Sequence, residues 1–272
     1  MPRTRSLTAV LRLVFLLAVA ATGLVGCASK GFNPSSFGGN NERLFAAGLR
    51  EFQRKKWDNA VTAFEKLTLD LPARDTLLPL SYYYLAQAHD RRGEHLLAAQ
   101  SYSRLVETFP DDTLADDALL GSGDAYKQLW RKPVLDKEYG QTAIQSYQAL
   151  LSLYPNSPLR DRATRSITQL QEWLAKKDYE NGMFYMRRKA YDSAIIYFRD
   201  VTKNYPTTSK ARASYLRLVD AYRAIHYRDD VADVCATLRQ SYPSDGEVRK
   251  KCGAGPATAA TPPAAAQPKP AQ

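Results

Sequence analysis

The stretch Ala98-Ala-Gln-Ser-Tyr102-Ser-Arg-Leu105-Val-Glu-Thr-Phe109-Pro110 contains the pattern that decides the fold of this chain. A small, a large and an aliphatic residue lie twelve, eight and five positions before a proline. Residues four and three positions apart fall on one face of a helix, and proline prevents the helix from continuing. The stretch therefore predicts an amphipathic helix that packs through Ala98, Tyr102 and Leu105.

The same register recurs before four more prolines, and successive prolines of the five are 38, 45, 51 and 37 residues apart. Such repetition indicates structural units that bury their apolar faces by stacking on one another. The full series consists of small positions Ala60, Ala98, Ala143, Ala194 and Val231, large positions Phe64, Tyr102, Tyr147, Phe198 and Cys235, aliphatic positions Leu67, Leu105, Leu150, Val201 and Leu238, and prolines Pro72, Pro110, Pro155, Pro206 and Pro243.

A partner helix is predicted before each of these helices, with a small residue where the two helices touch. These positions hold Gly48, Ala86, Gly123, Gly182 and Val219. The third unit carries an insertion near residues 133–140, and a long helical stretch over 158–189 precedes the helix of the fourth unit. The pattern resembles tetratricopeptide repeats. We therefore expect an all-α, right-handed α-solenoid of about five tetratricopeptide-like helix pairs over residues 41–252.

The two ends of the chain differ in composition from this body. Residues 1–26 are predicted to form a signal peptide, with Arg3, Arg5 and Arg12 before an apolar core that is too short to span a bilayer. The sequence Leu24-Val25-Gly26-Cys27 resembles the lipobox of bacterial lipoproteins, which predicts acylation of Cys27. Residues 27–40 are predicted to be a flexible tether and residues 253–272 a disordered Ala/Pro-rich tail.

Charged residues are explained mainly by helix ends and solvated faces. Removing residues 1–26 takes away three arginines and no acid, so the formal charge falls from +10 to +7. Asp58 and Asp192 are predicted to cap helices, and three acidic pairs should lie at helix starts. These pairs are Asp111-Asp112, Asp116-Asp117 and Asp229-Asp230. An exported chain without a dense basic run is not expected to bind nucleic acid.

Lipobox, tether and five irregular repeats together resemble the BamD family of outer-membrane assembly lipoproteins. Local matches are Tyr154-Pro155-Asn156-Ser157-Pro158 before the long helix, and Tyr185-Met186-Arg187-Arg188-Lys189-Ala190-Tyr191 before the next one. The resemblance implies a scaffold on the periplasmic face of the outer membrane. It also implies that the C-terminal half docks a BamA-type barrel subunit, and that the N-terminal repeats receive segments of unfolded outer-membrane proteins.

Groove recognition is the mechanism that follows from a concave solenoid face with apolar and aromatic side chains. Phe52, Tyr82, Tyr83 and His89 are the candidates for such a groove in the first two repeats. Packing inside the solenoid is at least as good an explanation for each of them and is the favoured one, because aromatic rings suit both roles.

Catalytic and metal-binding patterns are not expected. His89 and His95 are six residues apart and no Cys or Glu completes a zinc pattern, so no metal or other cofactor is predicted. Neither a phosphate-binding loop nor a nucleophile–base signature is present, and we predict that the chain is not an enzyme. Cys235 and Cys252 either form a disulfide at the C-terminal end of the solenoid or remain a buried and a free thiol.

Two other functions stay open at this stage. A lipoprotein adaptor or pilotin for cell-wall hydrolases or secretins would share the repeat class, without the long helix over 158–189. An enzyme with a solenoid support would need a catalytic domain outside residues 41–245, where only linker and tail remain.

Overall fold

The computed structural model describes residues 31–130 and 137–253, and all the regular structure in these ranges is helical. The predicted signal peptide, Cys27 and the predicted tail from residue 254 lie outside the described residues. The elements are η2 (Pro34–Phe37), α2 (Asn41–Gln53), α3 (Trp57–Asp70), α4 (Leu77–Arg92), α5 (His95–Thr108), α6 (Ala115–Leu129), α7 (Glu138–Leu153), α8 (Arg160–Arg187), α9 (Tyr191–Asn204), α10 (Ser209–Ala224), α11 (Arg228–Ser241) and α12 (Gly246–Cys252).

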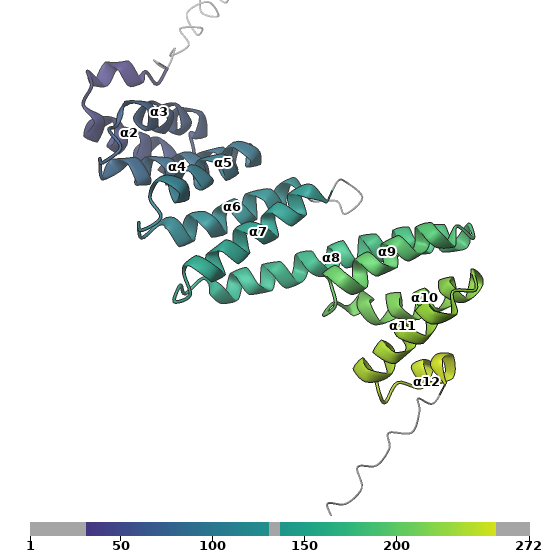
Figure 1. Cartoon of the computed structure of the whole chain (residues 1–272). Helices are drawn as coiled ribbons and strands as arrows, with labels where there is room; N and C mark the ends of the chain where they lie inside the picture. Colours follow the sequence, from purple (N-terminus) through teal and green to yellow (C-terminus); the bar gives the residue numbers. More distant parts are fainter. Residues whose placement is uncertain (1–30, 131–136, 254–272) are drawn as a thin grey trace, which may run out of the picture.

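Helices α2 to α11 form five pairs that stack in chain order (Figure 1). Each helix packs mainly on the helices before and after it, so the body is elongated and its two ends lie far apart. The predicted all-α solenoid of five helix pairs is confirmed. A helix pair alone leaves one apolar face open, and stacking closes that face against the next pair.

In the third and fourth pairs, the two helices come close where a glycine on the first helix meets a ring on the second. A Cβ atom on Gly123 would lie 2.5 Å from the ring of Tyr147, and one on Gly182 would lie 2.6 Å from the ring of Phe198. These distances are shorter than any real Cβ contact, so only glycine fits. The small partner position and the large position of the repeat are therefore opposite sides of one contact.

The fifth pair reverses this distribution of volume. Here Val219 takes the small position and Cys235 the large one, and both are buried in one cluster. A larger side chain on the first helix thus faces a smaller one on the second. The summed volume at the contact, rather than the residue type, is what the close packing of the pair requires.

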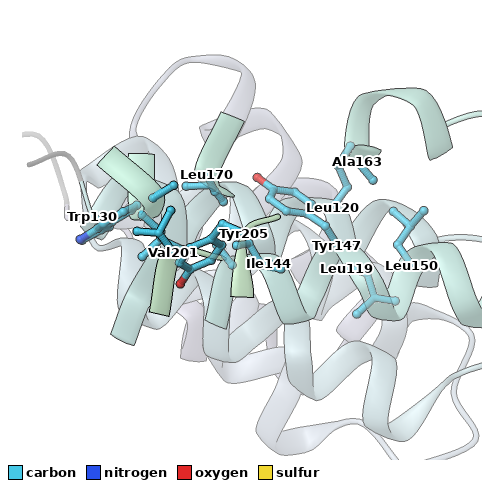
Figure 2. Packing of buried hydrophobic residues seen from close by; sticks show 13 residues of the cluster. Leu119, Leu120, Trp130, Ile144, Tyr147, Leu150, Ala163, Leu170, Val201 and Tyr205 are labelled. Atoms are coloured by element: carbon cyan, nitrogen blue, oxygen red, sulfur yellow. The ribbon is translucent and has the colours of Figure 1, made fainter. Parts of the chain in front are cut away.

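Helix α8 joins the third and fourth repeats without a break. It spans 28 residues, as the long stretch over 158–189 predicted, and it packs on α7, α9 and α10. One core cluster crosses this junction and combines side chains from α6, α7, α8 and α9 (Figure 2). The fully buried ring of Trp130 lies over Gly140, where a Cβ would come within 2.5 Å of the indole.

Two predictions about helix starts are corrected by the structure. Asp58 and Asp192 do not cap α3 and α9, because each is the second residue of its helix. The N-cap positions belong to Lys56 and Ala190, which make no side-chain capping bond. The two carboxylates instead lie in the first helical turn, where they favour the positive end of the helix dipole.

The three acidic pairs lie at or before helix starts. Asp116-Asp117 and Asp229-Asp230 occupy the first turns of α6 and α11. Asp111-Asp112 precedes α6, and the Asp112 carboxylate accepts a 2.8 Å hydrogen bond from the backbone N–H of Leu114.

The predicted tether and insertion also differ from expectation where they are described. Residues 31–40 are not a free tether, because η2 packs on α2 and α3 and its neighbours Phe32 and Phe37 pack against the core of the first repeat. Burial of two aromatic rings outweighs the flexibility that the Gly- and Asn-rich composition suggests. The insertion ends earlier than residue 140, since α7 begins at Glu138; residues 131–136 lie outside the described ranges.

We expect Gly123→Ala to lower the free energy of unfolding by about 1–3 kcal/mol, because the added methyl group overlaps the Tyr147 ring. Urea denaturation followed by circular dichroism measures the change. Gly246→Ala is the matched control, since its Cβ would have no heavy atom within 4 Å. Equal stability of the two variants would contradict the glycine–ring contact.

Candidate partner-binding surfaces

The aromatic residues of the first two repeats form an internal network. The Phe52 ring lies 5.0 Å from the Trp57 ring and 5.6 Å from the Tyr84 ring, both edge-on. Tyr84 also stacks on Phe64 at 5.6 Å. These contacts join α2, α3 and α4, so Phe52 packs inside the solenoid and does not present its ring to a groove.

His89 is likewise an internal residue, only 4% exposed. Its Nδ1 atom lies 2.7 Å from the Glu94 carboxylate across the turn between α4 and α5, and its Nε2 atom lies 3.9 Å from Glu65. The ring therefore fixes the turn between the two helices of the second pair. No group of three or more His, Cys, Asp or Glu side chains that could hold a metal occurs in the described residues.

Tyr82 and Tyr83 are half-buried on α4. Tyr82 packs between the cores of the first two repeats, and the ring of Tyr83 lies 5.9 Å from the rings of both Tyr84 and Tyr102. Burial and the nearby Asp117 carboxylate raise the pKa of Tyr83, so its hydroxyl stays protonated at neutral pH. Phe52, Tyr82 and Tyr83 thus pack with the aromatic and apolar core of the first two repeats, whereas His89 contacts acidic side chains at the α4–α5 turn.

A different surface, on α9, has the features of a docking site. Ile196 is 65% exposed and lines an open depression of about 530 Å³. The depression extends along α9 to the ring of Tyr215 on α10. Its lining consists of Ile195, Ile196, Arg199, Asp200, Thr202, Lys203 and Tyr215.

Comparison of the repeats shows that Ile196 departs from the pattern of this chain. It lies ten residues before the proline of its repeat, and the other four repeats place an exposed polar residue there. Those residues are Thr62, Gln100, Gln145 and Asp233. The position faces solvent in every repeat, so an isoleucine there cannot be explained by packing within the solenoid. Aligning this position across the five repeats would have identified it from the sequence.

Lys137 partly compensates the acidic charge beside the depression. Lys137, at the start of α7, lies 3.4 Å from the carboxylates of both Asp200 and the buried Asp178. Burial raises the pKa of Asp178, while Lys137 opposes that rise. For Lys137 itself, burial lowers the pKa, but the two carboxylates outweigh it and raise the pKa overall. Lys137 therefore offsets part of the negative charge of Asp200, and Arg199 and Lys203 add two cations to the lining of the depression.

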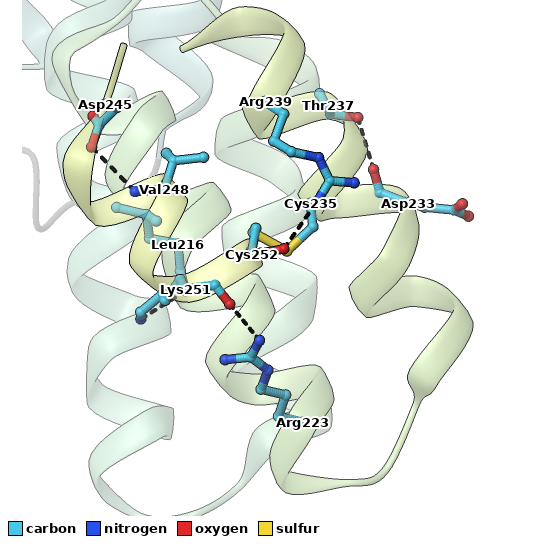
Figure 3. Close-up of a disulfide and its surroundings, with 10 residues drawn as sticks. All are labelled: Leu216, Arg223, Asp233, Cys235, Thr237, Arg239, Asp245, Val248, Lys251 and Cys252. Atoms are coloured by element: carbon cyan, nitrogen blue, oxygen red, sulfur yellow. Dashed lines mark hydrogen bonds between the residues drawn. A yellow bond between two sulfur atoms is a disulfide. The ribbon is translucent and has the colours of Figure 1, made fainter. Parts of the chain in front are cut away.

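A disulfide between Cys235 and Cys252 closes the C-terminal end of the solenoid (Figure 3). The two Cα atoms are 5.3 Å apart, and the bond joins α11 to the end of α12. Val248 of α12 is buried against the same cluster as Leu216 and Leu238. The short helix α12 thus covers the apolar face that the fifth pair would otherwise leave open.

Hydrogen bonds hold α12 at both of its ends. Arg223 and Arg239 donate to the backbone carbonyls of Lys251 and Cys252, which are among the last residues of the helix. At the first turn, Arg212 binds the Asp245 carboxylate and holds the pKa of that carboxyl well below its usual range. The Asp245 side chain also accepts from the N–H groups of Glu247 and Val248, as an N-cap does.

Stacked helix pairs with a capped C-terminal end define a protein of the α-solenoid class. The profile of the family YfiO, described as outer membrane lipoprotein, matches residues 39–238. The chain belongs to this outer membrane lipoprotein family, and the resemblance to the BamD family is confirmed.

Several proteins named outer membrane protein assembly factor BamD are similar to this chain. The protein of Caulobacter vibrioides is 24% identical over 233 residues, which cover 84% of this chain and 75% of its own length. That of Rickettsia prowazekii is 22% identical over 231 residues, 84% of this chain and 91% of its own. That of Vibrio cholerae is 34% identical over 96 residues, 35% of this chain and 40% of its own.

Solved tetratricopeptide structures also align with the chain. The TPR domain of P58(IPK) aligns with a TM-score of 0.42 and 15% identity over 78% of this chain and 54% of its own. The TPR2AB domain of yeast Sti1 gives a TM-score of 0.40 and 15% identity over 79% and 82%. Among the helices of the described ranges, none combines the length and the apolar character that crossing a bilayer requires.

We expect the double variant Cys235→Ser, Cys252→Ser to release α12 from the fifth pair. Closing a loop with a sequence separation of 17 residues contributes about 3 kcal/mol in the chain-entropy view. Hydrogen exchange should therefore be faster for the α12 amides and unchanged for α4 and α5. Reducing the parent should reproduce the effect, whereas unchanged α12 exchange after reduction would show that the bond does not hold the cap.

Proposed function

We propose that this protein is an outer-membrane lipoprotein scaffold of the β-barrel protein assembly complex and acts by binding, without catalysis. Family membership and the BamD relatives support this role. The described chain supports it as well, because its helices are accounted for by the stacked pairs and their C-terminal cap. An elongated stack offers several separate surfaces, which suits a subunit that holds more than one partner.

Lipid on Cys27 is the proposed means of attachment, with the solenoid on the periplasmic side of the outer membrane. Each buried methylene contributes about 0.8 kcal/mol, so more than one acyl chain anchors a protein stably. The sequence Leu24-Val25-Gly26-Cys27 supports this proposal. Since η2 packs on the first repeat, only a short segment would separate the lipid from the folded body.

Ile196 is the observation that supports a docking site for the BamA-type barrel subunit on α9. It is an exposed apolar residue in a register where the other four repeats have polar ones. Apolar anchors at the centre of a polar rim contribute most of the binding energy at many protein interfaces. Arg199 and Lys203 add two cations to the lining here, so the partner surface should combine an apolar side chain with carboxylates.

Segments of unfolded outer-membrane proteins are proposed to contact the first two repeats. Tyr82 and Tyr83 are the remaining candidates, because both are half-buried and Phe52 and His89 serve internal contacts. A half-buried tyrosine presents a ring edge and a hydroxyl to an extended peptide at little entropic cost.

We expect Ile196→Glu to reduce recovery of the barrel subunit by about tenfold or more, because a carboxylate would be buried at an apolar anchor position. Recovery is measured by affinity purification from detergent-solubilised envelopes. Leu69→Glu is the matched control, since Leu69 is 82% exposed on α3 and far from α9 in the stack. Equal recovery with both variants would sink the α9 site, and recovery of hydrolases or secretins alone would sink the assembly role.

We expect Cys27→Ala to move the protein from the membrane fraction to the soluble fraction. Loss of the acyl chains removes the apolar burial that holds the chain to the bilayer. Fractionation after a high-salt wash measures the change, because the wash also removes electrostatic attachment. Retention of the variant in washed membranes at normal yield would contradict lipidation of Cys27.

A further inference from the structure

The turns within helix pairs lie along one edge of the solenoid. Short turns make successive helices antiparallel, so alternate turns lie on opposite edges. In Figure 1 the α8–α9 and α10–α11 turns are on the right of the stack, whereas the α7–α8 and α9–α10 turns are on the left. The edge with the turns inside pairs is called the intra-pair edge below.

Exposed cations without an ion-pair partner recur along the intra-pair edge. Each of the four fully described turns has at least one, and none of these side chains has an ion pair or side-chain hydrogen bond among the described residues. They are Lys55, Arg91, Arg187, Lys189 and Arg228. On the opposite edge, the α5–α6 turn carries Asp111 and Asp112, and no Lys or Arg occurs between Leu105 and Tyr126. Exposed cations do occur elsewhere on that edge, at Arg74 in the α3–α4 turn and at Lys203 in the last turn of α9.

Backbone conformation at these turns points to a use for the cations. Lys55 and Lys189 have positive φ angles of 59° and 60°, and His226 has 64° at the equivalent point of the fifth pair. Gly93 takes this place in the second pair, with φ of 81°. A left-handed residue after a helix is usually glycine, and another residue there costs about 1–2 kcal/mol. Lysine at two of these places is thus not what turn stability alone favours.

Exposed apolar side chains gather at the same edge. The described residues include eight large hydrophobic side chains that are exposed, and five of them lie within one helical turn of an intra-pair turn. These five are Leu96, Leu97, Tyr139, Phe184 and Tyr227. Arg188 covers one face of the Phe184 ring, 3.9 Å from its centroid.

We propose that the intra-pair edge lies against a phospholipid surface and binds its anionic phosphate headgroups. Lysine and arginine beside tyrosine, phenylalanine and leucine are typical of protein surfaces at a membrane interface. The cations are also spread over four turns along an elongated body, which matches a planar negative surface better than a single acidic peptide. The proposal rests on the membrane placement given under Proposed function, and it gives the anchored solenoid a defined orientation.

The test uses the mature lipoprotein reconstituted in phosphatidylethanolamine vesicles with or without phosphatidylglycerol. Tyr227→Trp places a fluorophore on the intra-pair edge, and Leu69→Trp places one away from it. Quenching by lipids with brominated chains, corrected for the native tryptophans, reports how close each site comes to the bilayer. We expect phosphatidylglycerol to increase quenching at position 227 and not at position 69, and high salt to reverse the increase.

Two variants with the same loss of charge separate the edge from net charge. Both variants carry Tyr227→Trp. The edge variant also has glutamine in place of Lys55, Arg91, Arg187, Lys189 and Arg228. The control variant carries glutamine at five exposed cations elsewhere that have no ion-pair partner among the described residues: Arg43, Arg74, Arg165, Arg249 and Lys250. Each cation near an anionic surface contributes roughly fivefold to binding. The edge variant should therefore lose the phosphatidylglycerol-dependent quenching, and the control should keep it.

Equal loss in both variants would overturn the proposal in favour of a net-charge effect. Absence of any phosphatidylglycerol effect in the parent would overturn it as well. If the edge variant instead loses a copurifying acidic protein while quenching does not respond to phosphatidylglycerol, the edge binds a protein and not lipid. No partner protein is present in the vesicles, so each of these outcomes leaves the assembly role to the Ile196→Glu test.

Discussion

The fit of an aromatic ring into the space above a glycine is the contact on which this solenoid depends. Gly123 and Gly182 receive the rings of Tyr147 and Phe198 at distances that no Cβ atom permits. The contact brings the two helices of a pair close together and fixes their axial register, because the ring fits only at the position of the glycine. Each pair then offers the next pair a surface of defined shape, and the stack grows from that repetition.

The ends and edges of the stack show how such a repeated body acquires distinct surfaces. Close packing of a small against a larger side chain governs the inner face of each pair, by a glycine–ring contact in the third and fourth pairs, and leaves solvent-facing positions free to vary. Ile196 is one such variable position, within a helix. Lys55 and Lys189 are variable positions at turns, where the backbone adopts a left-handed conformation. At the C-terminal end, α12 and the Cys235–Cys252 bond replace the neighbour that a sixth pair would provide.

The repeat register could be read from the sequence because it depends on short-range spacing. Positions twelve, eight and five residues before each proline are buried in the first four repeats, and the fifth keeps Cys235 and Leu238. Individual surface roles could not be read in this way. His89 and Phe52 gain their internal partners from the α4–α5 turn and from Trp57 and Tyr84, and those meetings depend on how helices cross. The packing of Phe32 and Phe37 on the first repeat could not be predicted either, because the composition of their segment predicts flexibility.

Continuity of α8 has a mechanical consequence. A helix of 28 residues is about 42 Å long, and the core cluster around Tyr147, Leu170 and Val201 clamps it from both sides of its middle. It packs on α7 of the third pair as well as on α9 of the fourth, so one unbroken helix braces both repeats across the α7–α8 turn. Displacement of the C-terminal repeats by a bound partner would accordingly swing the N-terminal repeats through a larger arc, as a lever does.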